Sequence, residues 1–258
     1  MRFASLGSGS DGNGLLIEAG DTRLLLDCGF SPRETARRLS RLGVAPADIS
    51  GVVVTHEHAD HAGGVFAFAR RHALRVWMTH GTLLSLRELD EASDRGLSVE
   101  LIRGEAGFAI GDLALLPFTV PHDAREPVQF AVSDGARRLG VLTDAGCTTP
   151  LVERTLSGCD ALVLEANHDA ALLREGEYPP ALKARIAGRY GHLDNDSSAA
   201  ILSVLDCSRL QHVIAAHLSK HNNTPQLARA ALAAALGCEE HWVGVASQED
   251  GFGWRDIA

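Results

Sequence analysis

The sequence predicts an α/β protein built as a four-layered αββα sandwich, in which two β-sheets pack together and helices cover their outer faces. Short leucine-rich or β-branched runs each end in a polar residue, a pattern typical of buried strands that present side chains at their carboxyl ends. The runs are RLLLDCG, GVVVTHEH, LRVWMTH, LALLPFTVPH, RLGVLTDAG, DALVLEANH and QHVIAAHLS. Helical patterns separate several of them.

Local signals support the individual elements. The runs NGLLIEAG and TRLLLDCG are separated by a few residues around Gly20, which predicts a β-hairpin. In SPRETARRLSRLG, Ser31 can cap a helix, Pro32 stands at its first position and Gly43 follows its end. The segments NDSSAAILSVLD and TPQLARAALAAALG have the same helical pattern.

The 258 residues are enough to bury a substantial core, and no low-complexity linker divides them, so we expect a single domain over residues 1–258. No apolar stretch is long enough to cross a membrane and the N-terminus lacks the apolar core of a signal peptide, which predicts a cytoplasmic protein without a membrane partner. Five cysteines without a C-x-x-C pair suggest neither a disulfide framework nor a thiolate zinc site.

The net charge of −9 argues against a general affinity for polyanions, because binding of nucleic acid depends on neutralisation of phosphates by lysine and arginine. Arginines do cluster in residues 33–41, at 70–71 and in LKARIAGRYG. We expect most of these clusters to be solvated helix faces.

The segment THEHADH, residues 55–61, has an unusual density of metal-ligand side chains. It follows an apolar strand and precedes a helical pattern, so we expect a strand-to-helix loop. His56, His58 and Asp60 alternate and can converge on one centre, while His61 beside them can serve a second centre. The helical H-E-x-x-H arrangement of zinc proteases is excluded, because Asp60 stands where it needs its second histidine.

Later strands offer further ligands. His122, Asp144 and His217 each come after an apolar strand. Imidazole and carboxylate ligands suit zinc, and equally manganese or iron, since no thiolate is present in the set to select among them. We therefore expect two adjacent sites for divalent ions.

On these residues the chain resembles the metallo-β-lactamase-fold hydrolases, whose signature is H-x-H-x-D-H, and within them the YycJ/WalJ-like branch. The resemblance extends over the entire chain. In this branch GHLSN is usual, whereas Asp194 replaces the serine here. The motifs that resemble the branch are SLGSGSDGN, LLLDCGFS, VVVTHEHADHAGG, VPHDA, VLTDAG, LVLEANHD, YPPALKARIAGRYGHLDN and HLSKHNNTP.

The resemblance implies an αββα sandwich with a two-metal site between the sheets. It also implies the role of each ligand. His56, His58 and His122 resemble the ligands of a first metal; Asp60, His61 and His217 resemble those of a second; Asp144 resembles the bridging carboxylate; and Asp27 resembles the buried carboxylate that orients a ligand.

Two divalent ions ~3.5–4 Å apart lower the pKa of a shared water, present hydroxide at neutral pH and assist displacement at phosphorus. Hydrolysis is therefore the predicted reaction. The sequence offers neither a G-x-S-x-G elbow nor the G-K-[S/T] of a P-loop. We interpret GSGSDGNG as a tight loop at the rim of the site, with an ordinary turn as the alternative.

The loops GHLDND and HLSKHNN are predicted to contact substrate. Asp60 and His192 are the predicted catalytic residues, with His192 as a general acid. Lys183 and Arg185 are candidates for attracting phosphate. The predicted substrate-binding residues are Asn195, Ser219, Asn222 and Asn223, together with His168 and Tyr178, for which the resemblance is the reason.

Three hypotheses for function follow. The first, favoured by the resemblance, is a phosphodiesterase that acts on nucleic acid, as a 5′-directed DNA exonuclease. The second, favoured by the acidic charge, is a small-molecule hydrolase of a cyclic phosphodiester, a thioester or a lactone. The third is a metal-stabilised interaction module, which the complete set of ligands disfavours. The sequence does not predict an oligomeric state.

Overall fold

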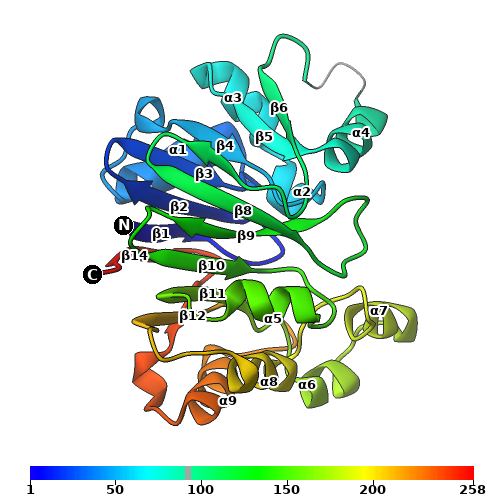
Figure 1. The fold of residues 1–258 in the computed structure, drawn as a ribbon. Helices are drawn as coiled ribbons and strands as arrows, with labels where there is room; N and C mark the ends of the chain where they lie inside the picture. The colour runs from blue at the N-terminus through cyan, green and yellow to red at the C-terminus, as the bar shows by residue number, and fades with distance from the viewer. Residues whose placement is uncertain (91–93) are drawn as a thin grey trace.

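The computed structural model describes residues 1–90 and 94–258. Two seven-stranded sheets lie face to face with helices on both outer faces (Figure 1). The predicted αββα sandwich is therefore confirmed.

The first sheet has the strand order β14-β1-β2-β3-β4-β5-β6. Its pairs are antiparallel from β14 to β3 and parallel from β3 to β6. The last strand of the chain thus returns to pair with the first. The strands are β1 (Arg2–Gly7), β2 (Gly14–Ala19), β3 (Thr22–Leu26), β4 (Gly51–Val53), β5 (Val76–Thr79), β6 (Val99–Ile102) and β14 (Phe252–Asp256).

The second sheet has the order β13-β12-β11-β10-β9-β8-β7. It repeats the plan of the first, because its pairs are antiparallel from β7 to β10 and parallel from β10 to β13. The strands are β7 (Phe108–Ile110), β8 (Leu113–Thr119), β9 (Val128–Ser133), β10 (Arg138–Leu142), β11 (Ala161–Glu165), β12 (His212–Ala216) and β13 (Gly244–Val245).

The helices of the first half cover the outer face of the first sheet, and those of the second half cover the second sheet (Figure 1). The helices are α1 (Pro32–Arg41), α2 (Ala59–Ala62), α3 (Val65–His72), α4 (His80–Leu89), α5 (Pro150–Leu156), α6 (Ala170–Glu175), α7 (Pro180–Ile186), α8 (Asn195–Val204) and α9 (Pro225–Leu236), with short 3₁₀ helices at Pro46–Asp48 and Glu240–Trp242. In the described ranges, no helix combines the length and apolarity needed to cross a lipid bilayer.

Alternation along the strands divides the apolar residues among three layers. In β11, Ala161 and Val163 face the layer between the two sheets, whereas Leu162 and Leu164 face the layer under α5, α8 and α9. In β3, Leu24 packs between the sheets and Leu25 packs under α1, α3 and α4. Both faces of these strands are buried, which explains their continuous apolar runs.

Several local predictions are confirmed. β2 and β3 form the predicted hairpin, with Ala19 paired to Thr22. The side chain of Ser31 caps α1 at Glu34 N, Pro32 begins the helix, and Gly43 beyond its end has a φ of 71°. Such a positive φ suits glycine because it has no Cβ.

The parallel strands of both sheets end at one edge of the sandwich, where most of the candidate ligands lie. β3 and β4 lead into Asp27 and the THEHADH segment, while β10 and β12 lead into Asp144 and His217. Open α/β sheets typically bind ligands outside the carboxyl ends of their strands.

Candidate metal centre

The sequence predicted a loop over the whole THEHADH segment, but only part of the segment is a loop. Residues Ala59–Ala62 form α2, a single helical turn that begins after His58. His56 and His58 precede this turn, whereas Asp60 and His61 lie on it. The helical turn therefore directs the two pairs of side chains to different positions.

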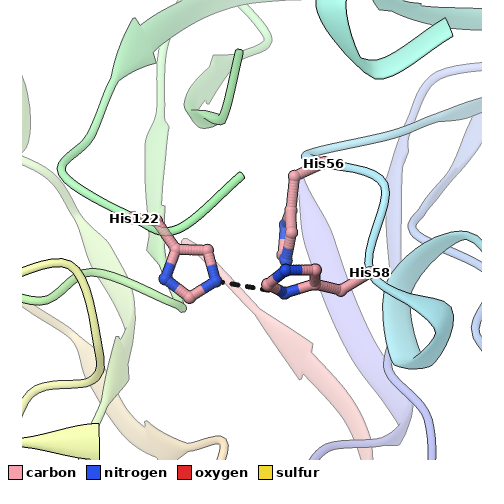
Figure 2. A group of neighbouring side chains, drawn as sticks. All are labelled: His56, His58 and His122. Carbon is pink, nitrogen blue, oxygen red and sulfur yellow. Dashed lines mark hydrogen bonds between the residues drawn. The ribbon is translucent and has the colours of Figure 1, made fainter. Parts of the chain in front are cut away.

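His56, His58 and His122 form the first group of candidate ligands (Figure 2). One nitrogen from each residue lies within 4.8 Å of the others. Nε2 of His122, which follows β8, is 3.3 Å from Nδ1 of His58. Histidines from both sheets thus meet at one point.

Asp60, His61 and His217 form the second group. Oδ2 of Asp60 lies 3.2 Å from Nε2 of His217 and 3.3 Å from Nε2 of His61. His217 directly follows β12 of the second sheet, whereas the other two residues lie on α2, which follows β4 of the first sheet. This group also spans the two sheets.

Asp144 lies between the two groups and is 2% exposed. Its Oδ2 is 2.8 Å from Nε2 of His61, and its Oδ1 is 3.6 Å from Nε2 of His217 and 3.9 Å from Nε2 of His122. One carboxylate can therefore reach atoms of both groups.

Three residues of the site adopt left-handed backbone conformations that favour glycine. Asp27 has a φ of 62°, while Asp144 and His217 each have a φ of 54°. Each stands at or just after the end of a strand. Such conformations cost about 1–3 kcal/mol each and cluster at functional sites, where the surrounding structure holds them in place.

Asp27 lies where a carboxylate that orients a ligand should lie. Its Oδ2 is 2.7 Å from Nδ1 of His61, and its Oδ1 accepts a hydrogen bond from the backbone N–H of Thr55 at 2.8 Å. Because Nδ1 of His61 faces Asp27, Nε2 is the nitrogen that faces the second group. Thr55 was not predicted, but it also lies 3.0 Å from Nδ1 of His56.

Burial and charge together set the protonation of the centre. Burial lowers the pKa of His61, but the carboxylates of Asp144, Asp27 and Asp60 together outweigh burial and raise that pKa well above its usual value. Burial likewise lowers the pKa of His217, whereas Asp144 and Asp60 help to raise it to about 10. Burial raises the pKa of Asp144, yet His217 and His61 hold it well below its usual range. The carboxylates are therefore charged, as ligands of a cation must be.

The donor atoms fit divalent metal ions. Nε2 of His56 is buried without a hydrogen-bond partner among the described residues, and such an atom is costly unless it binds something. Tetrahedral zinc with bonds of about 2.0–2.1 Å separates two ligand atoms by about 3.3–3.4 Å, close to the spacings within the second group. The histidine and aspartate clusters therefore indicate divalent metal binding.

His192 borders the centre, and its partner Glu165 was missed from the sequence. Nδ1 of His192 is 2.7 Å from Oε1 of Glu165, a residue with no exposed surface. Its ring stacks on that of His217, with centroids 5.3 Å apart. Glu165 closes the apolar strand β11, and a carboxylate at the end of a buried strand was the signal that could have revealed it.

Asp123 was also missed, although it directly follows His122. Its Oδ1 lies 3.5 Å from Nε2 of His122 and 3.8 Å from Nε2 of His58. Its Oδ2 accepts a hydrogen bond from Nε of Arg185, on α7, at 2.6 Å. A guanidinium is therefore held at the border of the first group.

Several predicted substrate-binding residues bond within the protein. Asn195 exchanges two amide hydrogen bonds with Asn223, and His168 is buried with its Nδ1 3.3 Å from Oδ1 of Asn167. Asn222 is also buried. The pair of Asn195 and Asn223 ties two loops together, and a direct contact with substrate stays a prediction for all four predicted residues.

Ser219 and Tyr178 are half-buried, and neither belongs to the ligand groups. Oγ of Ser219 accepts a hydrogen bond from the backbone N–H of Asn222 at 3.2 Å, while Tyr178 packs edge-on against His221. Their contact with substrate likewise stays a prediction.

Asp194 caps a helix, a role that the serine of the related motif could also fill. It is the N-cap of α8, and its carboxylate accepts a hydrogen bond from the N–H of Ser197 at 2.6 Å. Serine and aspartate are both favoured helix caps. The substitution therefore preserves the start of α8.

Comparison with known proteins agrees with this geometry. Residues 22–217 match the family model described as the beta-lactamase superfamily domain. The chain belongs to this superfamily. Its fold is also similar to that of zinc-bound PqqB from Methylobacterium extorquens, with a TM-score of 0.75 at 19% identity over the full length of both chains.

Sequence similarity to individual proteins identifies the branch of the superfamily to which the chain belongs. It is 33% identical to the exodeoxyribonuclease YycJ of Bacillus anthracis, over 95% of this chain and 92% of that protein. It is 29% identical to the exodeoxyribonuclease WalJ of Streptococcus pneumoniae, over 95% of this chain and 91% of that protein. The predicted YycJ-like family is confirmed, and with it the prediction of a metal-dependent hydrolase.

Proposed function

We propose that the protein is a phosphodiesterase that cleaves nucleic acid with two divalent metal ions, acting as a 5′-directed DNA exonuclease. The main support for a centre of two ions is the position of Asp144, whose carboxylate lies within 4 Å of histidine nitrogens in both ligand groups. A single tetrahedral site would use only three or four ligands. The surplus of converging side chains favours two ions.

The residues that would hold the two ions form the two ligand groups described above. The first group would hold one ion and the second group the other, with Asp144 between them. Zinc fits the imidazole and carboxylate ligands, and manganese or iron fits them equally.

Ions bound here would activate water as a nucleophile and neutralise charge on a phosphate. The protein's own residues would supply the remaining steps. Glu165 holds Nδ1 of His192, so that Nε2 can give a proton to the leaving oxygen. Arg185, held by Asp123 beside His58 and His122, would bind a non-bridging phosphate oxygen.

The relatives favour nucleic acid as the substrate class, because two proteins similar along 95% of this chain are named exodeoxyribonucleases. The net charge of −9 favours a second candidate, a hydrolase of a small phosphodiester, a thioester or a lactone. With so acidic a chain, DNA would bind through few phosphate contacts.

A reducing compartment suits the protein. All five cysteines are free, and Cys28 and Cys159 are buried. Together with the relatives, this favours work in the cytoplasm.

The function can be tested by digestion of end-labelled substrates. Metal-loaded protein would be incubated with single- and double-stranded DNA labelled at either end, with RNA, and with bis-p-nitrophenyl phosphate. We expect labelled mononucleotides to be released early from DNA labelled at its 5′ end, whereas DNA labelled at its 3′ end should shorten gradually.

Controls separate this activity from a contaminating nuclease. Asp144→Asn should be inactive, whereas Ser203→Ala, at an exposed position near the end of α8, should retain wild-type activity. Rapid hydrolysis of a small phosphodiester or thioester with every DNA and RNA end intact would favour the second candidate instead.

A further inference from the structure

The glycine-rich segment between β1 and β2 packs against the second ligand group. Ser8 and Asn13, at the two ends of this segment, are only 7% and 6% exposed. Both are polar side chains in a buried position, so their hydrogen bonds show what the segment does.

Asn13 is bonded to the helical turn that presents Asp60. Its backbone N–H donates to the carbonyl oxygen of Asp60 at 2.7 Å. Its Nδ2 lies 3.2 Å from Oδ2 of Asp60 and 3.0 Å from Nε2 of His61. The amide of Asn13 thus touches the ligand atoms of two members of the second group.

Ser8 is bonded to the third member, His217. The backbone N–H of His217 donates to Oγ of Ser8 at 2.9 Å. Oγ of Ser8 in turn lies 3.1 Å from Oδ1 of Asn13 and can donate to it. A continuous chain of hydrogen bonds therefore joins His217, through Ser8 and Asn13, to Asp60.

The segment is built to hold this position. Gly9 and Gly12 have φ values of 144° and 149°, which side chains rarely adopt. A Cβ on Gly29 would lie 1.8 Å from the carbonyl oxygen of Asp60, so the backbone at Gly29 packs directly against the turn that carries Asp60. Arg38, 8% exposed, donates from Nη1 to the carbonyl oxygen of Leu6 at 2.7 Å and fixes the preceding strand end.

We propose that Ser8 and Asn13 are positioning residues of the second ligand group, which hold Asp60 and His217 at the spacing needed to bind one ion. Asp60 and His217 come from different sheets, and the left-handed backbone of His217 needs an external support. The hydrogen-bond chain supplies both the link and the support. This inference rests on the metal binding in the proposed function.

The first ligand group has no such dependence. No hydrogen bond of Ser8 or Asn13 in the described ranges reaches His56, His58 or His122. Loss of either side chain should therefore weaken one ion selectively. A side chain that served only the stability of the fold would affect both ions alike.

The test uses zinc-loaded protein and a competing chelator. Zinc content per chain would be measured by elemental analysis as the free zinc concentration is lowered, for the wild type, Ser8→Ala, Asn13→Ala and the matched control Ser10→Ala. Ser10 lies in the same segment but is exposed. The temperature of unfolding would be measured for each protein.

We expect both variants to keep one ion with wild-type affinity and to bind the other about 10–100-fold more weakly, as is usual when a partner of a metal ligand is removed. Ser10→Ala should match the wild type. If Asn13→Ala does not fold, Ser8→Ala decides, because it removes a single hydroxyl.

If Ser8→Ala and Asn13→Ala both retain two ions with unchanged affinity, this inference is overturned, while the proposed function is unaffected. Equal weakening of both ions would also overturn it. A wild type that binds no zinc, manganese or iron would instead overturn the proposed function and this inference with it.

Discussion

Oε1 of Glu165 lies 2.7 Å from Nδ1 of His192. A fully buried carboxylate is thus paired with the histidine that borders the metal centre. Burial lowers the pKa of His192, but the carboxylates of Glu165 and Asp144 together outweigh burial, so this pKa is raised. A general acid must hold its proton until the leaving group takes it. The pairing therefore keeps His192 protonated at higher pH.

The first prediction concerns this pair. Glu165→Gln should lower turnover and shift the basic limb of the pH–rate profile to lower pH, because His192 loses the charge that raises its pKa. His192→Ala should lower turnover by about 10²–10⁴ without removing metal. Rates measured across pH would show both effects.

The double variant provides the control. If Glu165 acts through His192, Glu165→Gln combined with His192→Ala should be no slower than His192→Ala alone. Additive losses in the double variant would show that Glu165 has a separate task.

The second prediction separates the ligand groups. Asp60→Ala should abolish hydrolysis and leave the fold intact, because Asp60 lies on a one-turn helix and its side chain faces the centre. Asp144→Ala should lower the rate of hydrolysis even further, since Asp144 reaches both ligand groups. Steady-state rates and circular dichroism would check this. Asp60→Ala activity within about tenfold of wild type, or about 1.4 kcal/mol in the barrier, would contradict a two-metal mechanism.

The third prediction concerns pH and metal affinity. In the metal-free protein the pKa of His217 is raised to about 10, so the residue is protonated at neutral pH. A metal ligand must be deprotonated, and bound metal therefore has to displace this proton. Zinc affinity should increase as pH rises from about 6 to about 9, with proton release.

Calorimetric titration in buffers of different ionisation enthalpy would count the protons released. A zinc affinity independent of pH, with no proton release, would show that His217 is not a ligand.

The fourth prediction concerns substrate binding. Arg185→Ala should raise KM for DNA about two- to fivefold, because Arg185 is exposed and such contacts are screened by solvent. The slope of log affinity against log salt should become shallower by about one unit. Arg174→Ala, which alters an exposed arginine paired with Glu175 on α6, is the matched control. Equal effects of the two variants would argue against a specific contact of Arg185.

The fifth prediction concerns thiols. Burial raises the pKa of Cys28 to about 12 and that of Cys159 to about 11, so neither should react with a thiol reagent in the native protein at neutral pH. Cys147 and Cys238 are half-buried and should react first. Cys28→Ala should keep both metal ions and activity. Rapid labelling of Cys28, or metal loss in the variant, would count against its role in packing.

The sequence predicted best what depends on strands. A buried strand appears as a short apolar run, and the residue after it is placed by the sheet, which is why Asp144 and His217 were found. Asp27 was identified only through the family resemblance. The helical turn at Ala59–Ala62 was missed, because a four-residue helix has no apolar period of its own.

Residues that act through long-range hydrogen bonds were harder to predict. Glu165 was hidden because a single acid at a strand end has many explanations. The link from Asn13 to Asp60 joins positions 47 residues apart, which no local pattern reveals. Asn195 and Asn223 were predicted to contact substrate because both are polar, yet their amides pair with each other.

Element-specific anomalous diffraction from crystals of metal-loaded protein tests the central claim most directly. Two metal peaks ~3.5–4 Å apart are predicted, one beside His56, His58 and His122, the other beside Asp60, His61 and His217, with Asp144 between them. A single peak at full occupancy, or peaks away from these side chains, would contradict the account.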